Sequence, residues 1–202
     1  GMDYNAGGAR YNTSYLQGVG IGTVTDSLAA IQANVFDKQD FSMDELLDAL
    51  HNNFENYPQI YNTVTNRSPK YGNDDDTADD IMQEVFEAYY SIVTGRPNTR
   101  GGEFRINMLP TTCHVYFGEV MQASADGRFA GKPVSEGISP VQGVDTLGPT
   151  AVIQSAAKMN QLSTGGTLLN QKFTPSVVAG KQGLENMADM IRAYFDQDGH
   201  HI

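Results

Sequence analysis

The sequence has few basic residues, a single cysteine and no long apolar run. Of its 202 residues, 13 are Lys or Arg and 24 are Asp or Glu, so the formal net charge is −11. An acidic chain without a basic run repels phosphate groups, so neither nucleic acid nor a membrane surface is an expected partner. The apolar runs are far shorter than the roughly 20 residues of a membrane helix, and no signal-peptide pattern opens the chain. We therefore expect a cytoplasmic protein.

The scarcity of soft ligands argues against a metal site. Cys113 is the single cysteine, which excludes an internal disulfide framework. His200 and His201 are adjacent, and on a strand they would point to opposite faces, so they cannot both bind one ion. As a nucleophile, Cys113 would need a base beside it, and on a strand its neighbour His114 would face the other way. A buried free thiol is expected instead.

What is present fits a globular fold. Hydrophobic residues make up 40% of the chain and charged residues 18%, which is enough apolar material for a core and too little charge for a disordered chain. The length suits one domain or a piece of one. Because the chain begins without a terminal cap and ends in what reads as the start of a strand, at Gly199–Ile202, we expect a fragment.

Apolar spacing and capping signals predict helices that alternate with strands. Ser42 and Glu45 have the spacing of a capping box, and residues 73–77 place carboxylates where a helix N-terminus favours them. The helices are expected in 23–36, 43–54, 58–64, 77–93, 151–159 and 184–195. Strands are expected in 104–108, 113–117 and 167–173, with a loop over 118–149. This order favours an α/β fold with parallel pairing across long crossovers.

Two motifs invite a ligand and have simpler explanations. Gly18, Gly20 and Gly22 suggest a dinucleotide loop, but the third glycine comes one position early and no clear strand precedes it, so a tightly packed turn is favoured. Asp74, Asp75, Asp76, Asp79 and Asp80 suggest a calcium loop, but the EF-hand ligand order is absent. A solvated first turn of a helix is favoured there.

The segment Pro110–His114 differs from these motifs. It brings two hydroxyls and an imidazole to the expected start of a strand, and strand ends around a barrel are places where substrate groups converge. The hydroxyls of Thr111 and Thr112 can orient a small ligand, and they can equally cap their own backbone. Composition alone leaves both readings open.

Several segments in collinear order resemble the pyruvate formate-lyase type glycyl radical enzymes. They are Ala9-Arg10-Tyr11-Asn12-Thr13-Ser14-Tyr15, Asp26-Ser27-Leu28, Pro69-Lys70-Tyr71-Gly72-Asn73-Asp74, Ala125-Asp126-Gly127-Arg128-Phe129-Ala130-Gly131-Lys132-Pro133, Gly137-Ile138-Ser139-Pro140, Gly148-Pro149-Thr150-Ala151 and Gly199-His200-His201. Segments 109–118 and 165–173 look most like the trans-4-hydroxy-L-proline dehydratase branch. The resemblance covers nearly the whole chain.

The resemblance implies a partial α/β barrel, the second half of a ten-stranded barrel wrapped by helices. Residues 1–202 would form a single fragment of that barrel domain. In the family, a glycyl radical installed by a radical-SAM activase generates a thiyl radical on a cysteine, which takes hydrogen from a small-molecule substrate. The resemblance also implies that the protein forms a homo-oligomer and that the full-length protein has the activating enzyme as a partner.

The departures from the family pattern limit what this chain contributes. Cys113 does not stand in a Gly-Cys-x-Glu type loop, and no Arg-Val-x-Gly-Tyr motif occurs. The chain would therefore lack the radical cysteine and the C-terminal glycyl radical domain, and it would not be catalytic alone. Only substrate binding remains, for which Thr111, then Thr112, then His114 are the candidates.

The resulting hypothesis is a fragment of a radical dehydratase, a C–O lyase that acts on hydroxyproline in anaerobic metabolism. Pyruvate formate-lyase (formate acetyltransferase) and diol dehydratase chemistry are the enzymic alternatives. A non-catalytic α/β structural or interaction module is the alternative of a different class.

Overall fold

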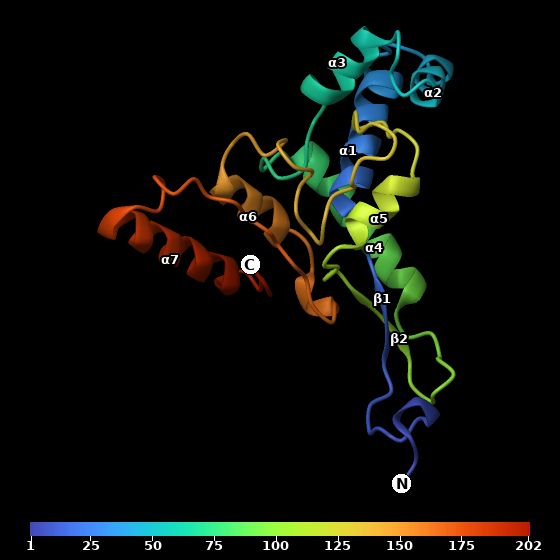
Figure 1. The fold of residues 1–202 in the computed structure, drawn as a ribbon, viewed down its shortest axis with the longest axis vertical. Coiled ribbons are helices and arrows are strands. Elements are labelled where there is room, and N and C mark those ends of the chain that lie inside the picture. Colours follow the sequence, from blue (N-terminus) through green and yellow to red (C-terminus); the bar gives the residue numbers. More distant parts are fainter.

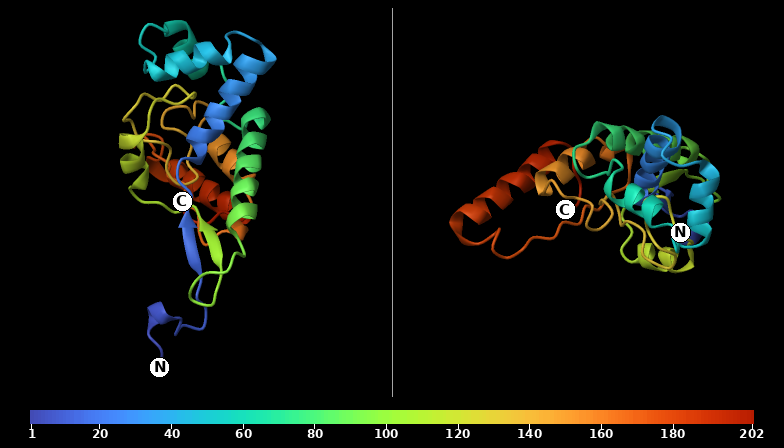
Figure 2. Two further views of the ribbon diagram at one scale, coloured as in Figure 1. Left: turned by 90° about the vertical axis from the view of Figure 1, so that its right-hand side faces the viewer. Right: turned by 90° about the horizontal axis from the view of Figure 1, so that it is seen from above.

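The computed structural model describes residues 1–202, which form an elongated body with three projections (Figure 1). The N-terminal segment lies at one end of the long axis, and two short helices lie at the other end. The last long helix projects to the side, as the right-hand view of Figure 2 also shows, and the left-hand view shows the N-terminal segment and the two short helices at opposite ends. The elements in chain order are η1 (Tyr4–Ala6), β1 (Ser14–Gln17), α1 (Ile21–Ile31), η2 (Gln32–Asp37), α2 (Met43–His51), α3 (Pro58–Asn66), α4 (Asp76–Val93), β2 (Phe104–Asn107), α5 (Cys113–Val120), α6 (Pro149–Ala157), η3 (Gln161–Ser163) and α7 (Gly180–Asp196).

A narrow parallel arrangement joins distant parts of the chain. β1 pairs with β2 in parallel, with Ser14 opposite Phe104 and Gln17 opposite Asn107. Beyond these strands, Met108 forms a parallel bridge to Thr167, and Leu168 forms one to His201. The chain is thus a mixed helix and strand structure with parallel pairing, as the sequence predicts. The half-barrel stays a prediction, because the only sheet here has two strands.

The predicted helices are present with small shifts of their ends. The capping box of α2 is complete, because the Ser42 hydroxyl accepts from the Glu45 N–H and the Glu45 carboxylate accepts from the Ser42 N–H. Asp75 caps α4, where its side chain accepts from the Thr77 N–H. Helix α1 continues directly into the π-helical turn η2, so the helix predicted over 23–36 is present, and only the π-helical form of its last part was not indicated by the sequence.

Two of the expected strands are absent, and one strand was not expected. Segment 113–117, predicted as a strand, is the first part of helix α5, and in the predicted strand 167–173 only Thr167 and Leu168 pair, each in an isolated bridge. Conversely, β1 was missed, and it precedes the glycine-rich turn that was expected to lack a strand. Three of its four residues are exposed, so no alternation of buried and exposed positions marks it. Its pairing with β2 makes it a strand.

Two hydrophobic clusters support the fold. The larger one lies around α4, β2, α6 and Tyr194 of α7, and the smaller one joins α1, α2 and α3 to Ala125. Helices α1 and α4 pack against each other (Figure 1). The larger cluster includes Ile106 and Met108, so the core packs where the chain leaves the carboxyl end of β2.

None of the helices combines the length and the apolar composition needed to cross a bilayer.

Candidate functional site

The loop Leu109–Thr112 leaves the carboxyl end of β2 and leads into α5. Parallel strands bring their carboxyl ends to one edge, so this loop lies beside the residues that follow β1. The Gln17 side chain, at the end of β1, accepts from the Leu109 N–H at 3.1 Å and donates to the Leu109 carbonyl at 3.5 Å. Pro110 is buried. The base of the loop is therefore fixed to β1 while its tip stays open.

Thr111 and Thr112 occupy the open tip, and both are exposed. Thr112 is the residue that caps α5, yet its side chain makes no capping hydrogen bond. The Thr112 carbonyl accepts from the Val115 N–H at 3.1 Å. Neither hydroxyl is bonded to the backbone, so the capping reading has no support. Both hydroxyls are free to bind another group.

Cys113 and His114 begin α5 and do not lie on a strand. Consecutive helical residues are about 100° apart, so the argument that their side chains face opposite ways does not apply. Cys113 is free and half-buried, less enclosed than the sequence analysis expected. His114 points its Nε2 atom toward the Glu136 carboxylate, 3.7 Å away. The structure therefore turns the imidazole toward the segment before Gly137.

The glycine-rich turn between β1 and α1 is tightly packed, as predicted. A Cβ atom on Gly18 would lie 2.2 Å from the Met108 sulfur, and Gly22 lies against Ser135 and Ser139. Gly20 has φ +88°, which favours glycine. Protein atoms already fill the space on these sides of the turn.

The acidic cluster at the start of α4 surrounds a lysine. Lys158 Nζ lies 2.7 Å from Asp79, 2.8 Å from Asp76 and 3.1 Å from Asp74. Ser155 also donates to Asp79, at 3.0 Å. Although burial opposes it, bonding to the three carboxylates raises the pKa of Lys158. The prediction of a solvated turn is wrong for Asp79, whose side chain is fully buried.

The structure contains no group of three or more His, Cys, Asp or Glu side chains that could hold a metal ion.

Asp26 is a buried acid that the sequence analysis did not single out. It lies on α1 and accepts from the Tyr71 N–H at 2.8 Å, while its second oxygen has no partner. Burial raises the pKa of Asp26 to about 7, against the opposing effects of Lys70 and the Tyr71 N–H. Lys70 donates to the Asp126 carbonyl at 3.0 Å. The sequence feature that could have identified Asp26 is that it is the single acid in the mostly apolar stretch 21–31.

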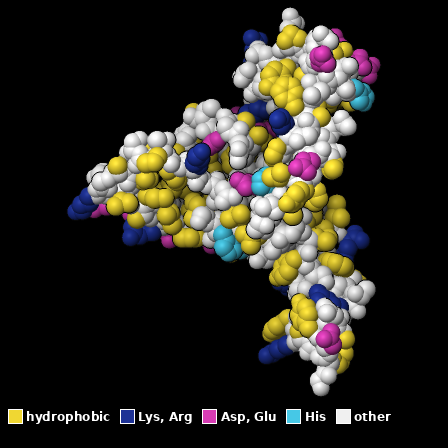
Figure 3. Space-filling view, in the orientation of Figure 1, with side chains coloured by type: hydrophobic (Ala, Val, Ile, Leu, Met, Phe, Trp, Pro, Cys, Tyr) yellow, Lys and Arg dark blue, Asp and Glu magenta, His cyan; other side chains and the backbone are white.

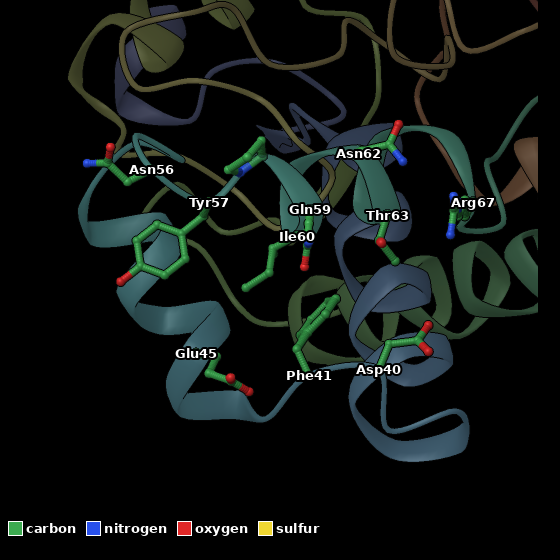
Figure 4. A pocket seen from close by; sticks show the side chains of 11 residues that line it. Asp40, Phe41, Glu45, Asn56, Tyr57, Gln59, Ile60, Asn62, Thr63 and Arg67 are labelled. Atoms are coloured by element: carbon green, nitrogen blue, oxygen red, sulfur yellow. The ribbon is translucent and has the colours of Figure 1, made fainter.

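Two polar hollows lie away from this loop. One, of about 750 Å³, lies between α2 and α3 (Figure 4), where Asp40, Glu45 and Arg67 border it together with Tyr57 and Ile60. The other, of about 640 Å³, lies between residues 136–149 and residues 170–173. Glu136 borders the second hollow, and its carboxylate also faces His114. Thr111 and Thr112 border neither hollow.

Comparison with known families divides the chain into two matched regions. Residues 1–118 match the family model described as pyruvate formate lyase-like, and residues 134–202 match the model described as glycine radical. Residues 119–133, the end of α5 and the loop after it, separate the two matched regions. That the radical-bearing glycine lies outside the chain stays a prediction, and the Arg-Val-x-Gly-Tyr motif does not occur in residues 1–202.

Similar proteins are much longer than this chain. It is 68% identical over 202 residues to trans-4-hydroxy-L-proline dehydratase of Clostridioides difficile, covering all of this chain and 26% of that protein. It is 37% identical over 208 residues to (2S)-3-sulfopropanediol dehydratase of Klebsiella oxytoca, covering all of this chain and 25% of that protein. The chain thus spans about a quarter of the length of these relatives.

Solved structures give the same picture. The crystal structure of hydroxyproline dehydratase from Clostridioides difficile with trans-4-hydroxy-L-proline bound superimposes with a TM-score of 0.97 at 68% identity, covering 99% of this chain and 25% of that one. The glycerol-bound B12-independent glycerol dehydratase from Clostridium butyricum gives 0.92 at 42% identity, covering 97% and 25%.

Proposed function

We propose, since the chain belongs to the pyruvate formate lyase-like family, that it is a segment of a glycyl radical dehydratase that acts on trans-4-hydroxy-L-proline. The observation that carries the proposal is the 68% identity to a hydroxyproline dehydratase over the entire chain. The two family models, which between them match residues 1–118 and 134–202, support the same assignment.

In this proposal the chain's own residues bind and orient the substrate. A glycyl radical, installed by a radical-SAM activase, would supply hydrogen-atom abstraction in the full-length enzyme. Elimination of water also needs the hydroxyl and carboxyl groups of the substrate held in one orientation. The exposed hydroxyls of Thr111 and then Thr112 are suited to that role, because neither is used inside the chain.

A diol dehydratase is the second candidate. Its support is the likeness to the glycerol dehydratase and to a structure of 1,2-propanediol dehydration in Roseburia inulinivorans, with a TM-score of 0.92 at 38% identity. Both identities are well below 68%, so hydroxyproline is favoured. Formate-lyase chemistry and a non-catalytic module have no comparable support.

The test uses the full-length protein of which this chain would be a segment. With a radical-SAM activase and SAM under strict anaerobiosis, we expect an organic radical in electron paramagnetic resonance and dehydration of trans-4-hydroxy-L-proline. Glycerol and 1,2-propanediol serve as competing substrates. Residues 1–202 alone should give neither signal nor product. Turnover of a diol in place of hydroxyproline would replace the proposal by the second candidate.

A further inference from the structure

The segment 132–136 lies directly on helix α5. The Val134 N–H donates to the His114 carbonyl at 3.2 Å. A Cβ atom on Gly118 would lie 2.2 Å from the Lys132 carbonyl oxygen, so only glycine permits the helix to come this close. The backbone of this segment and the backbone of α5 are therefore in contact at both ends of the helix.

The same segment is joined to α1 by a pair of buried hydrogen bonds. The Ser135 N–H donates to the Thr23 hydroxyl at 2.9 Å, and the Thr23 N–H donates to the Ser135 hydroxyl at 3.1 Å. Both residues are buried. The Glu136 carbonyl then accepts from the Ser139 N–H at 2.8 Å. Glu136 therefore extends from a backbone that is fixed on either side.

The Glu136 carboxylate faces the imidazole of His114. The Nε2 to Oε2 distance is 3.7 Å, which is too long for a direct hydrogen bond and suits an ion pair when the ring is protonated. The side chains are 15% and 19% exposed, so solvent screens their attraction less than at an open surface. His114 Nδ1 is buried without a partner. Within residues 1–202 the His114 side chain makes no hydrogen bond, and Glu136 is its one ion-pair partner.

His114 follows the candidate threonines directly in the chain, three residues after Thr111 and two after Thr112. Thr111 and Thr112 make no side-chain hydrogen bond of their own, so their direction depends on the backbone that enters α5. His114 lies in the first turn of that helix. Whatever restrains the His114 side chain therefore also restrains the backbone of the two threonines.

We infer that Glu136 is a positioning residue which, through His114, fixes the direction of the Thr111–Thr112 tip. The inference deepens the proposed function and rests on it for its effect on substrate. It also changes the role of His114: the ring is turned to Glu136, so His114 acts through the threonines and does not contact the substrate itself.

The first test needs no substrate. In the full-length protein, Glu136→Ala is compared with the wild type by hydrogen–deuterium exchange read out by mass spectrometry. We expect exchange to become several-fold faster in peptides covering 111–116. The matched control is Glu103→Ala, which removes an ion pair to Arg105 of 2.8 Å on the exposed side of β2. It should leave peptides 111–116 unchanged.

Exchange of residues 111–116 that is unchanged in Glu136→Ala would overturn the inference. If Glu136→Ala does not fold, His114→Gln removes the other partner, and the same local acceleration is expected from it. An increase spread evenly over the whole chain would indicate a general loss of stability, and this result would also count against a positioning role.

The second test measures the effect on substrate. We expect Glu136→Ala to raise KM for trans-4-hydroxy-L-proline by about three- to ten-fold with a smaller change in kcat. In a Thr111→Val, Thr112→Val background the same substitution should add no further loss. A fully additive loss would contradict the inference.

The two tests separate this inference from the proposed function. If the activated wild-type protein does not dehydrate hydroxyproline, the proposed function fails, and the exchange experiment still decides whether Glu136 fixes the loop. If hydroxyproline is dehydrated and exchange at 111–116 is unaffected, the proposed function stands and the inference fails.

Discussion

At the scale of single residues, the sequence indicated the two exposed threonines but neither the buried Asp26 nor the half-buried Glu136. The two threonines stood out because their hydroxyls, together with the His114 imidazole, lie where a strand was expected to begin. Asp26 and Glu136 did not, since their significance depends on neighbours far along the chain: Tyr71 lies 45 positions from Asp26, and His114 lies 22 positions from Glu136. Whether an acid is buried depends on the folded chain. A single sequence indicates a buried acid only where that acid interrupts an apolar stretch.

The Thr111 hydroxyl is expected to matter for substrate and not for stability. Replacing Thr111 by Val keeps the β-branched shape and removes a hydroxyl that makes no hydrogen bond in the chain. If it binds substrate in the full-length enzyme, the loss is about 1–3 kcal/mol, or roughly five- to one-hundred-fold in kcat/KM. Steady-state kinetics and thermal unfolding measure the two effects.

Thr99→Val serves as the control, because Thr99 is also exposed and lies in a different loop. It should change neither quantity. A Thr111→Val variant with full kcat/KM would remove Thr111 from the candidate site.

Asp26 should make the stability of residues 1–202 depend on pH. Because burial raises the pKa of Asp26 to about 7 from 3.8, the folded state binds the proton more tightly than the unfolded chain does. The stabilisation is complete below about pH 4 and is lost as the pH rises through about 7, by up to roughly 4 kcal/mol. Urea unfolding at several pH values measures it.

Asp26→Asn should remove most of this pH dependence, since an amide oxygen still accepts from the Tyr71 N–H and carries no charge. Asp80→Asn, on the exposed side of α4, should leave the dependence intact. If the wild type becomes more stable between pH 4 and pH 7, the assignment of Asp26 is wrong.

At the scale of elements, periodicity predicted the helices well and the strands poorly. Helices α4 and α7 carry their own evidence in apolar spacing. Segment 113–117 alternates as a strand does because Cys113, Val115 and Phe117 are apolar. Yet Tyr116 is apolar too, so the two periods cannot be told apart there. Gly118 of this helix lies against the backbone of Lys132. The pattern of apolar residues within 113–117 does not indicate this contact.

Lys158 should prove important for holding α6 against the start of α4. Lys158→Met keeps the side-chain length and leaves the buried Asp79 carboxylate with Ser155 alone. Since Lys158 is about a quarter exposed, we expect a loss of roughly 1–3 kcal/mol, below the cost of breaking a fully buried pair. Urea unfolding at pH 7 measures the loss.

Lys181→Met on α7 is the matched control, since the Lys181 side chain is 90% exposed and pairs with Glu185 at 3.6 Å. It should change the free energy of unfolding by less than about 0.5 kcal/mol. Equal losses for both variants would contradict the role given to Lys158.

At the scale of the whole molecule, a substantial apolar surface lies open. Hydrophobic side chains gather over the projecting α7 region (Figure 3), where Leu184 and Phe195 are exposed. Val120 and Tyr116 of α5 are exposed as well. Surfaces of this kind are normally covered by other protein. The collinear order of motifs gave the family from the sequence, but it did not show which faces are open.

Residues 1–202 should therefore self-associate at micromolar concentration. Light scattering should report particles heavier than one chain, because burial of the open apolar faces stabilises contact between copies. Val120→Lys combined with Leu184→Lys should lower the average mass, since charges on both faces oppose that contact. A monomeric wild type with high thermal stability would show that these faces need no cover.

The parallel pairing of β1 with β2 has a consequence for how the chain is made. Ser14 pairs with Phe104, so β1 cannot form until the chain has been synthesised as far as Phe104. At a synthesis rate of about 5–20 residues per second, that delay is on the order of 5 to 20 seconds. Closing so large a loop also costs entropy before any pairing is gained. During translation, residues 14–17 therefore leave the ribosome as an unpaired edge, open to chaperones or to a second nascent chain.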